Sequence, residues 1–376
     1  MAMRVLVAPQ EFKGSLTAAE AARAIAAGVR KAVPAAEVIL APMSDGGPGL
    51  VEVMLSRGAT RVEAGCSDPL MRPIRGAFAL LEDGSAVIEM AAASGLVLLT
   101  AAERDPLAAT TFGTGELILA ALDRGCRSII IGVGGSATVD AGAGALQALG
   151  VRLLGVEDRE LPRGGGALAG LARIDVSRVD TRMAATRMRV AVDVRNTLCG
   201  ETGAAAMFGP QKGASAADVA LLEEGLRRFA EVARRDCGVD VESLAGGGAA
   251  GGLSAGLVAG VGATIEPGFE LVAEVIGLEA LIAGADIVIT GEGRLDAQTA
   301  FGKTASGVAR MARQRGKPVG VLAGSVVGDA GQGVFDEVEV VTPVGMSLEE
   351  GMRDAEALLR AGALRIVGRL ASGGLG

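Results

Sequence analysis

The stretch that decides the fold is residues 286–304, DIVITGEGRLDAQTAFGKT. Its apolar run Ile287–Ile289 is β-branched, which favours a strand. The Gly291–Gly293 segment that follows predicts a sharp turn at the carboxyl end of this strand. In open α/β sheets, ligands bind at that end of the strands. The stretch therefore indicates a ligand site at the edge of a parallel sheet.

Charged side chains follow the expected turn. Glu292, Arg294 and Asp296 occupy alternate positions, so an extended backbone would direct all three to one side. Lys303 lies at the expected start of a helix, where exposed N–H groups and the helix dipole favour an anion. A phosphate-binding P-loop would need glycine where Ala297 stands, so that motif is absent. An anion site and a solvated surface loop remain equal alternatives for this stretch alone.

Both ends of the chain show strands alternating with helices, which is typical of a parallel sheet. The expected strands are 4–9, 37–43, 286–290, 319–323 and 337–341, and the expected helices are 17–31, 50–57, 302–315 and 348–370. Thr17 and Glu20 have the spacing of a capping box at the start of the first helix. Between the two ends of the chain, the polarity of the side chains alternates along residues 72–90 on both sides of Asp83-Gly84, which predicts an antiparallel hairpin. We therefore expect a Rossmann- or flavodoxin-like α/β domain from residues 1–64 and 284–376, a second α/β domain inserted at 65–283, and ligands in the cleft between them.

Composition excludes several classes of function. The net charge is −8 and aromatic residues make up 2% of the chain, which argues against nucleic acid as a partner. The chain has no histidine, so acid–base chemistry falls to carboxylates, lysine or cysteine. The four cysteines are far apart and suggest neither a zinc site nor a disulfide framework. Without an apolar run long enough for a membrane span, and with a strand expected directly at the N-terminus, the cytoplasm is the expected location.

The inserted region carries two further candidate sites. In GVGGSATVD, residues 132–140, glycines follow a strand and precede a helix, so the backbone could approach an anion closely, with Ser136 among the donors. A tight connection is the alternative. Lys212 lies between Gly209-Pro210 and Gly213, outside any expected helix, either held toward a ligand or solvated. The strand expected at 188–194 ends near Asp193 and Asn196.

Taken together, the motifs resemble the bacterial glycerate 2-kinase family over essentially the full chain. The pieces that carry the resemblance occur in the order of that family: APQEFKGSL, PMSDGG, IEMAAASGL, RDPL, FGTGELI, GVGGSAT, GAGALQALG, FGPQKGAS, GGAAGG, ITGEGRLD and LAGS. The resemblance implies the two-domain fold described above. It also implies transfer of the γ-phosphoryl group of ATP to the 2-hydroxyl of D-glycerate with Mg²⁺, in the catabolism of organic acids.

The candidate residues suit that reaction, which requires mainly positioning and positive charge. The carboxylates are the candidate base and metal-linked acids, with Asp193 and Asp296 in these roles and Asp45 and Glu292 supporting them. The remaining candidates would hold the glycerate carboxylate and the phosphates: Lys13, Gly134, Gly135, Ser136, Asn196, Lys212, Arg294 and Lys303. The expected partners are therefore ATP and a small acid, with neither nucleic acid nor membrane, and homo-oligomerisation stays open.

Several positions depart from the family pattern. Gln10 stands where the family has Asp, Pro48 where it has Glu, and Val139 where it has Asn; Leu50, Arg195 and Thr197 also differ. These changes keep open a diverged, non-catalytic relative that binds a small anion, or an enzyme that phosphorylates another small hydroxy acid. A nicotinamide-dependent oxidoreductase is a more distant alternative, because the dinucleotide fingerprint is missing.

Overall fold

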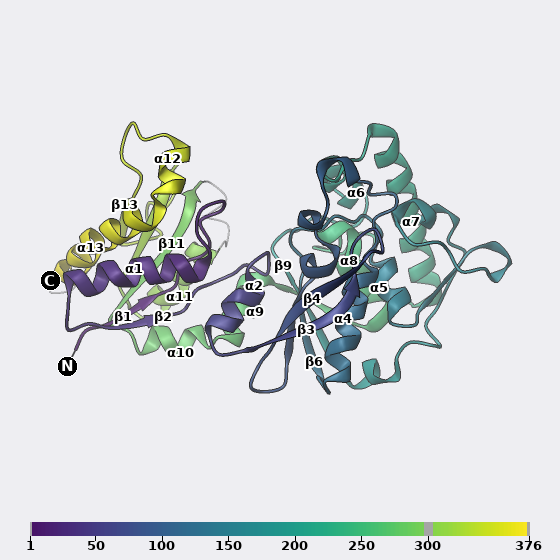
Figure 1. The fold of residues 1–376 in the computed structure, drawn as a ribbon, viewed down its shortest axis with the longest axis horizontal. Helices are drawn as coiled ribbons and strands as arrows, with labels where there is room; N and C mark the ends of the chain where they lie inside the picture. The colour runs from purple at the N-terminus through teal and green to yellow at the C-terminus, as the bar shows by residue number, and fades with distance from the viewer. Residues whose placement is uncertain (1, 297–303, 374–376) are drawn as a thin grey trace. The chain divides into compact units, whose positions relative to one another are not determined.

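The structure is a computed structural model that describes residues 2–296 and 304–373. The described chain forms two compact units (Figure 1). Unit 1 comprises residues 1–45 and 269–376, and unit 2 comprises residues 46–268. The first unit is thus built from both ends of the chain, and the second is inserted between them.

Unit 1 has a five-stranded sheet in which every pairing is parallel. Its strand order is β13-β12-β11-β1-β2. The strands are β1 (Arg4–Val7), β2 (Glu37–Leu40), β11 (Ile287–Leu295), β12 (Val319–Val326) and β13 (Glu337–Val340). The central position of β1 and β11 explains their nearly continuous apolar sequences, because parallel strands covered on both faces read this way.

Helices cover both faces of this sheet. The helices are α1 (Ala18–Ala32), α9 (Gly268–Val275), α10 (Leu278–Ala283), α11 (Thr304–Gln314), α12 (Leu348–Arg353) and α13 (Ala355–Gly373). α1 and α13 pack side by side and share a core with Val5, Val7 and Ile289 (Figure 1). The predicted capping box of α1 is confirmed, since Glu20 N donates to Thr17 Oγ1 and Thr17 N donates to Glu20 Oε2.

The predicted turn at Gly291–Gly293 is wrong. β11 continues through these residues to Leu295 and pairs with β12, with Glu292 opposite Ala323 and Arg294 opposite Ser325. The glycines serve close packing, because a Cβ added at Gly291 would lie 3.3 Å from the Phe12 ring. Likewise β12 runs through Gly324-Ser325 to Val326 instead of ending there.

Unit 2 contains a six-stranded mixed sheet of order β10-β9-β6-β5-β4-β3. Its strands are β3 (Thr60–Ser67), β4 (Pro73–Leu80), β5 (Ala86–Glu89), β6 (Ser128–Gly132), β9 (Arg187–Val192) and β10 (Thr264–Pro267). β4 and β5 form the hairpin predicted around Asp83-Gly84. β5, β6, β9 and β10 pair in parallel, so their carboxyl ends lie at one edge. A separate two-stranded sheet joins β7 (Arg152–Leu154) and β8 (Arg173–Asp175).

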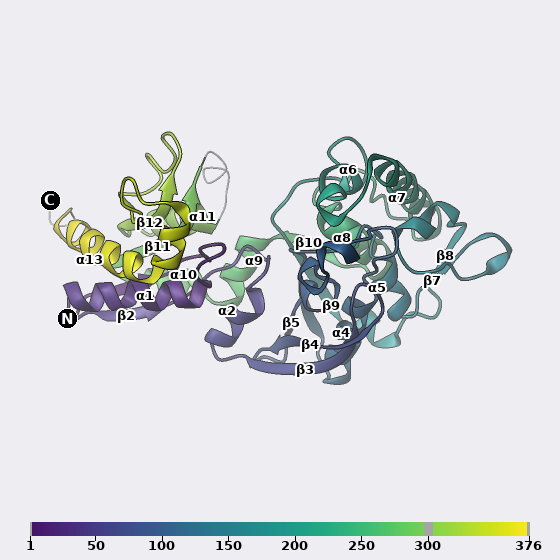
Figure 2. The ribbon, with the colours of Figure 1, turned by 45° about the horizontal axis from the view of Figure 1, so that its top comes forward.

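The α-helices of unit 2 enclose two apolar clusters. They are α2 (Leu50–Ser56), α3 (Ala91–Ser94), α4 (Phe112–Asp123), α5 (Ala143–Ala148), α6 (Ala204–Phe208), α7 (Ala216–Asp236) and α8 (Ala249–Val261). One cluster lies between the sheet and α4, and the other gathers around α7, where Phe229 is fully buried. Figure 2 shows α7 and α8 beside α6, as their contacts require.

Two further expectations need correction. The expected single helix at 348–370 is α12 followed by α13, divided at Asp354. Lys212, expected outside any helix, lies in a 3₁₀ turn, η6 (Pro210–Lys212), that follows α6, since Pro fits the first turn of a helix.

The structure is an α/β protein with a parallel-sheet unit from both termini and an α/β insertion. The domain boundaries expected after residue 64 and after residue 283 stay a prediction. Within residues 2–296 and 304–373, no helix combines the length and apolarity that a bilayer span requires.

Candidate active site

In unit 1, candidate residues gather just beyond the carboxyl ends of β1, β2 and β11. Lys13 follows β1, Asp45 follows β2, and Asp296 directly follows β11. The segment after β1 lies along β11, since Gln10 N donates to Gly291 O at 2.8 Å. Parallel pairing places these three ends at one edge of the sheet.

Gln10 and Asp45 are in direct contact. The Gln10 side-chain amide donates to Asp45 Oδ2 at 2.9 Å, and Gln10 is buried. Burial raises the pKa of the neighbouring Glu11 carboxyl, Lys13 lowers that pKa, and Asp45 raises it. This edge of the sheet therefore carries two carboxylates, one amide and one lysine that interact with one another, which is an arrangement suited to a charged ligand.

Glu292, Arg294 and Asp296 lie at the end of β11. Glu292 is 7% exposed, whereas the Arg294 side chain is open to solvent and its Nε lies 3.9 Å from Asp296 Oδ2. Because Glu292 and Arg294 are two residues apart on one strand, they share a face of the sheet. Lys303 lies outside the described residues.

In unit 2, the loop after β6 presents a row of backbone donors. Among the described residues, no acceptor is found for the N–H groups of Gly134, Gly135 or Ser136. Gly135 has a positive φ of 72° and is exposed, Gly134 is half-buried, and Ser136 is buried. Successive N–H groups in such a turn form a concavity that binds anions.

Neighbouring segments hold this loop in place. Leu96 N donates to Gly135 O at 2.8 Å, and Ala137 N donates to Ser94 O at 2.9 Å. Gly134 packs so closely on residues 47–48 that an added Cβ would lie 2.7 Å from Gly47 Cα. The donors are thus preorganised, which lowers the cost of binding an anion.

Lys212 lies behind the loop and does not reach solvent. It is 1% exposed, and its Nζ donates to Ser136 Oγ at 2.6 Å and to the Thr138 carbonyl at 2.7 Å. Burial lowers the pKa of Lys212 to about 7, while the Asp140 carboxylate acts in the opposite direction. The solvated-loop alternative for Lys212 is therefore wrong, because η6 turns the side chain inward.

Asp140 fixes the far end of the same loop. This fully buried carboxylate accepts from Thr111 N at 2.8 Å, Thr111 Oγ1 at 2.9 Å, Gly142 N at 3.1 Å and Gly144 N at 3.2 Å. Burial raises its pKa, and these hydrogen bonds lower it. Asp140 therefore ties the loop to α4 and α5 instead of facing a ligand.

Asp193 and Asn196 follow β9, the parallel neighbour of β6. Asp193 is exposed, and the Asn196 side-chain amide donates to Thr202 O at 2.7 Å. Since β6 and β9 end at the same edge, the structure places both residues at the edge that carries the Gly134–Ser136 loop. Whether either touches a ligand stays a prediction.

Comparison with known proteins matches this chain to the family described as the glycerate kinase family, over residues 5–371. The chain belongs to the glycerate kinase family. It is 46% identical to the glycerate kinase of Halalkalibacterium halodurans, over 96% of this chain and 97% of that protein. It is 44% identical to the glycerate 2-kinase of Escherichia coli, over 99% of both chains.

A solved structure extends the comparison to the fold. The crystal structure of a Salmonella typhimurium LT2 protein assigned as glycerate kinase 2 superposes with a TM-score of 0.90 at 44% identity, over 99% of both chains. The chain described here is therefore an enzyme, a kinase of this family, and the resemblance inferred from its motifs is confirmed.

The described part of the kinase contains no preformed metal-binding site. Residues 2–296 and 304–373 contain no group of three or more acidic or cysteine side chains that could hold a metal ion. The described carboxylates thus do not fit a Mg²⁺ site made by the protein alone. The predicted Mg²⁺ ligands, Asp193 and Asp296, belong to different units and stay a prediction.

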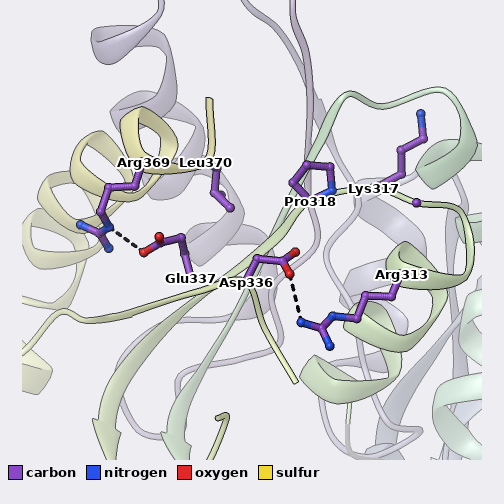
Figure 3. A pocket seen from close by; sticks show the side chains of 8 residues that line it. Arg313, Lys317, Pro318, Asp336, Glu337, Arg369 and Leu370 are labelled. Carbon is purple, nitrogen blue, oxygen red and sulfur yellow. Dashed lines mark hydrogen bonds and ion pairs between the residues drawn. The ribbon is translucent and has the colours of Figure 1, made fainter. Parts of the chain in front are cut away.

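A cavity of about 430 Å³ in unit 1 lies away from the candidate residues. It opens at the amino ends of β12 and β13, the sheet edge opposite Asp45 and Asp296. Most of the charged side chains that line it form ion pairs, Arg313 with Asp336 at 3.0 Å and Arg369 with Glu337 at 2.7 Å (Figure 3). These ion pairs brace the sheet and do not form part of the candidate site of the kinase.

Sequence reasoning missed two features of the kinase. The Gln10–Asp45 hydrogen bond joins segments 35 residues apart, and the only signal for it was the departure from the family at position 10. Thr111, which holds Asp140, lies beside the FGTGELI motif, but its contact is set by packing between α4 and α5. Both features depend on tertiary structure that local patterns do not encode.

Proposed function

We propose that this kinase transfers the γ-phosphoryl group of ATP to the 2-hydroxyl of D-glycerate, which yields 2-phosphoglycerate in the catabolism of organic acids. The observation that carries the proposal is the Gly134–Ser136 loop, whose N–H groups have no acceptor in the described part of the chain, in a chain that belongs to the glycerate kinase family. Relatives named glycerate kinase and glycerate 2-kinase support the choice of substrate.

The chemistry of phosphoryl transfer suits the residues that the kinase has. The transition state needs cations and amide donors around the phosphoryl oxygens, and a carboxylate suffices to orient or deprotonate an alcohol. We assign Lys13, Lys212, Arg294 and Lys303 to positive charge around anionic groups, and Asn196 to a polar contact. Asp296, Asp193, Asp45 and Glu292 are the assigned carboxylates. The proposal includes Mg²⁺ as part of the nucleotide substrate, because Mg²⁺ commonly binds through phosphates with few protein ligands.

Measuring ADP formation with a panel of small hydroxy acids tests this proposal. We expect D-glycerate to give the highest kcat/KM. Replacing Asp296 by Asn should lower kcat by about 100-fold or more with little change in KM, because a group that acts in the transition state affects turnover. Asp83→Asn, at the exposed hairpin turn between β4 and β5, is the matched control and should keep full activity. Unchanged turnover of Asp296→Asn would remove Asp296 from the site.

The Gln10–Asp45 hydrogen bond favours a second candidate. An amide at position 10 removes one carboxylate from the edge of unit 1, which would alter acceptor choice or weaken phosphoryl transfer. Faster ADP formation with another hydroxy acid than with D-glycerate would support altered specificity. Calorimetric binding of D-glycerate without ADP production would support a non-catalytic relative.

A further inference from the structure

Lys212 determines whether the Ser136 hydroxyl donates or accepts the hydrogen bond between these two side chains. A protonated lysine is a donor only, whereas a hydroxyl has one hydrogen and two acceptor positions. Lys212 Nζ lies 2.6 Å from Ser136 Oγ, so a charged Lys212 makes Ser136 the acceptor of this hydrogen bond. The hydroxyl hydrogen of Ser136 must then point elsewhere. Ser136 is 8% exposed, and the adjoining Gly135 is open to solvent.

When Lys212 is charged, its ammonium group has only neutral hydrogen-bond partners. Its two hydrogen-bond acceptors are a hydroxyl and the Thr138 carbonyl, and no carboxylate lies within ion-pair distance of Nζ among the described residues. Asp140 is the charged group that acts on Lys212, at longer range. The exposed Arg104 donates to the backbone O of the adjacent Gln211 at 3.5 Å. A buried ammonium without a counterion is costly, and an anion nearby would offset that cost.

We propose that Lys212 is a positioning residue that turns the Ser136 hydroxyl outward as a donor to a carboxylate or phosphate on the Gly134–Ser136 loop, and that binding of this anion protonates Lys212. The inference rests on the proposed function for the identity of the anion. In the free protein, burial lowers the pKa of Lys212 to about 7, so at pH 8 most molecules hold it neutral. Neutral Lys212 can accept from Ser136, which turns the hydroxyl hydrogen inward and weakens the subsite.

Isothermal titration calorimetry measures the coupling directly. D-Glycerate and Mg-ADP are titrated separately into the full-length protein, in buffers with different ionisation enthalpies, at pH 6.0 and pH 8.0. The dependence of the observed enthalpy on the buffer gives the number of protons taken up. We expect uptake of about 0.5–1 proton at pH 8.0 with the probe that occupies the loop and close to none at pH 6.0, because a nearby anion raises a lysine pKa by one or more units.

Three variants identify the group that takes up the proton. Lys212→Met should abolish the uptake while keeping the buried aliphatic stem. Ser136→Ala should keep the uptake but weaken binding of the same probe about tenfold, since one hydrogen bond to a charged group is lost. Lys31→Met, an exposed lysine near the end of α1, is the matched control and should behave as the wild type. Should Lys212→Met fail to fold, the wild-type rise in uptake between pH 6.0 and pH 8.0 remains the test.

The result that overturns the inference is binding without proton uptake at pH 8.0, the same uptake in Lys212→Met as in the wild type, or no binding of either probe. Phosphorylation of D-glycerate is measured on the same samples. Phosphorylation without proton uptake refutes the role of Lys212 alone. Uptake that depends on Lys212 without phosphoryl transfer refutes the proposed function and leaves the inference standing.

Discussion

Gln10 Nε2 donates to Asp45 Oδ2 at 2.9 Å, which joins the segments after β1 and β2. Replacing Gln10 by Asp, the residue of the family pattern, would set two carboxylates against each other beside Glu11. We expect Gln10→Asp to lower the melting temperature by about 2–4 °C without divalent cations, because like charges at close range destabilise the folded state. Millimolar Mg²⁺ should restore at least half of the loss, as measured by thermal unfolding.

Gln332→Asp supplies the control for this experiment. The Gln332 amide donates to Asp329 Oδ1 at 3.1 Å in an exposed loop, so the same chemical change occurs where solvent screens it. Its melting temperature should hardly change, with or without Mg²⁺. A Gln10→Asp protein as stable as the wild type would show that position 10 does not tune charge at this edge.

Asp140 is expected to support the loop through its hydrogen bonds. Asp140→Asn places amide hydrogens against N–H donors in a fully buried site, so it should destabilise unit 2 by about 3 kcal/mol. Urea unfolding followed by circular dichroism measures the loss. Asp83→Asn, at the exposed hairpin turn where Asp83 accepts from Ser85 N, should cost far less. Equal losses in the two variants would contradict the anchoring role.

Lys212 should give the stability of the protein a distinct pH dependence. Burial lowers its pKa to about 7 in the folded state from 10.5, so between these values the unfolded chain binds more protons. Stability from this group is therefore lost as pH falls toward 7 and grows as pH rises above 7, by about 1 kcal/mol per pH unit. The difference in unfolding free energy between wild type and Lys212→Met, taken at pH 7.0, 7.75 and 8.5, should change with that slope. A difference independent of pH would contradict a buried, titrating Lys212.

Gly134 should be intolerant of a side chain. A Cβ there would lie 2.7 Å from Gly47 Cα and from Pro48 Cδ, so Gly134→Ala must displace the loop. Loss of one N–H bond to an anion predicts about tenfold or greater weakening of binding, measured by calorimetry with D-glycerate and Mg-ADP. Gly65→Ala, in β3 where an added Cβ meets open space, should bind both probes normally.

Patterns within short stretches predicted much of the fold. The Thr17–Glu20 capping box and the hairpin around Asp83-Gly84 depend on spacing along the chain, and both are present. Gly291–Gly293 misled because glycine marks a turn in isolation, whereas here it allows β11 to lie against Phe12 and β12. The prediction that the strand ends in a turn used only neighbouring residues, so it could not include the packing against Phe12 and β12 that keeps the strand extended.

The site was predicted less completely for the same reason. GVGGSATVD indicated an anion-binding loop from its glycines alone, and the N–H groups of Gly134, Gly135 and Ser136 have no acceptor among the described residues. The burial of Lys212 could not be read from FGPQKGAS, because the partners of its ammonium lie 76 and 74 residues away. Contacts of that range arise from the fold and leave no periodic pattern in the sequence.

The identity of the product tests the central claim most directly. Purified protein is incubated with ATP, Mg²⁺ and D-glycerate, and the phosphorylated product is examined by ¹H and ³¹P nuclear magnetic resonance. The account predicts consumption of D-glycerate, one ADP for each product molecule, and a phosphorus nucleus coupled to the proton on carbon 2. Phosphorylation on carbon 3, or intact D-glycerate after prolonged incubation with active-site concentrations of protein, would contradict it.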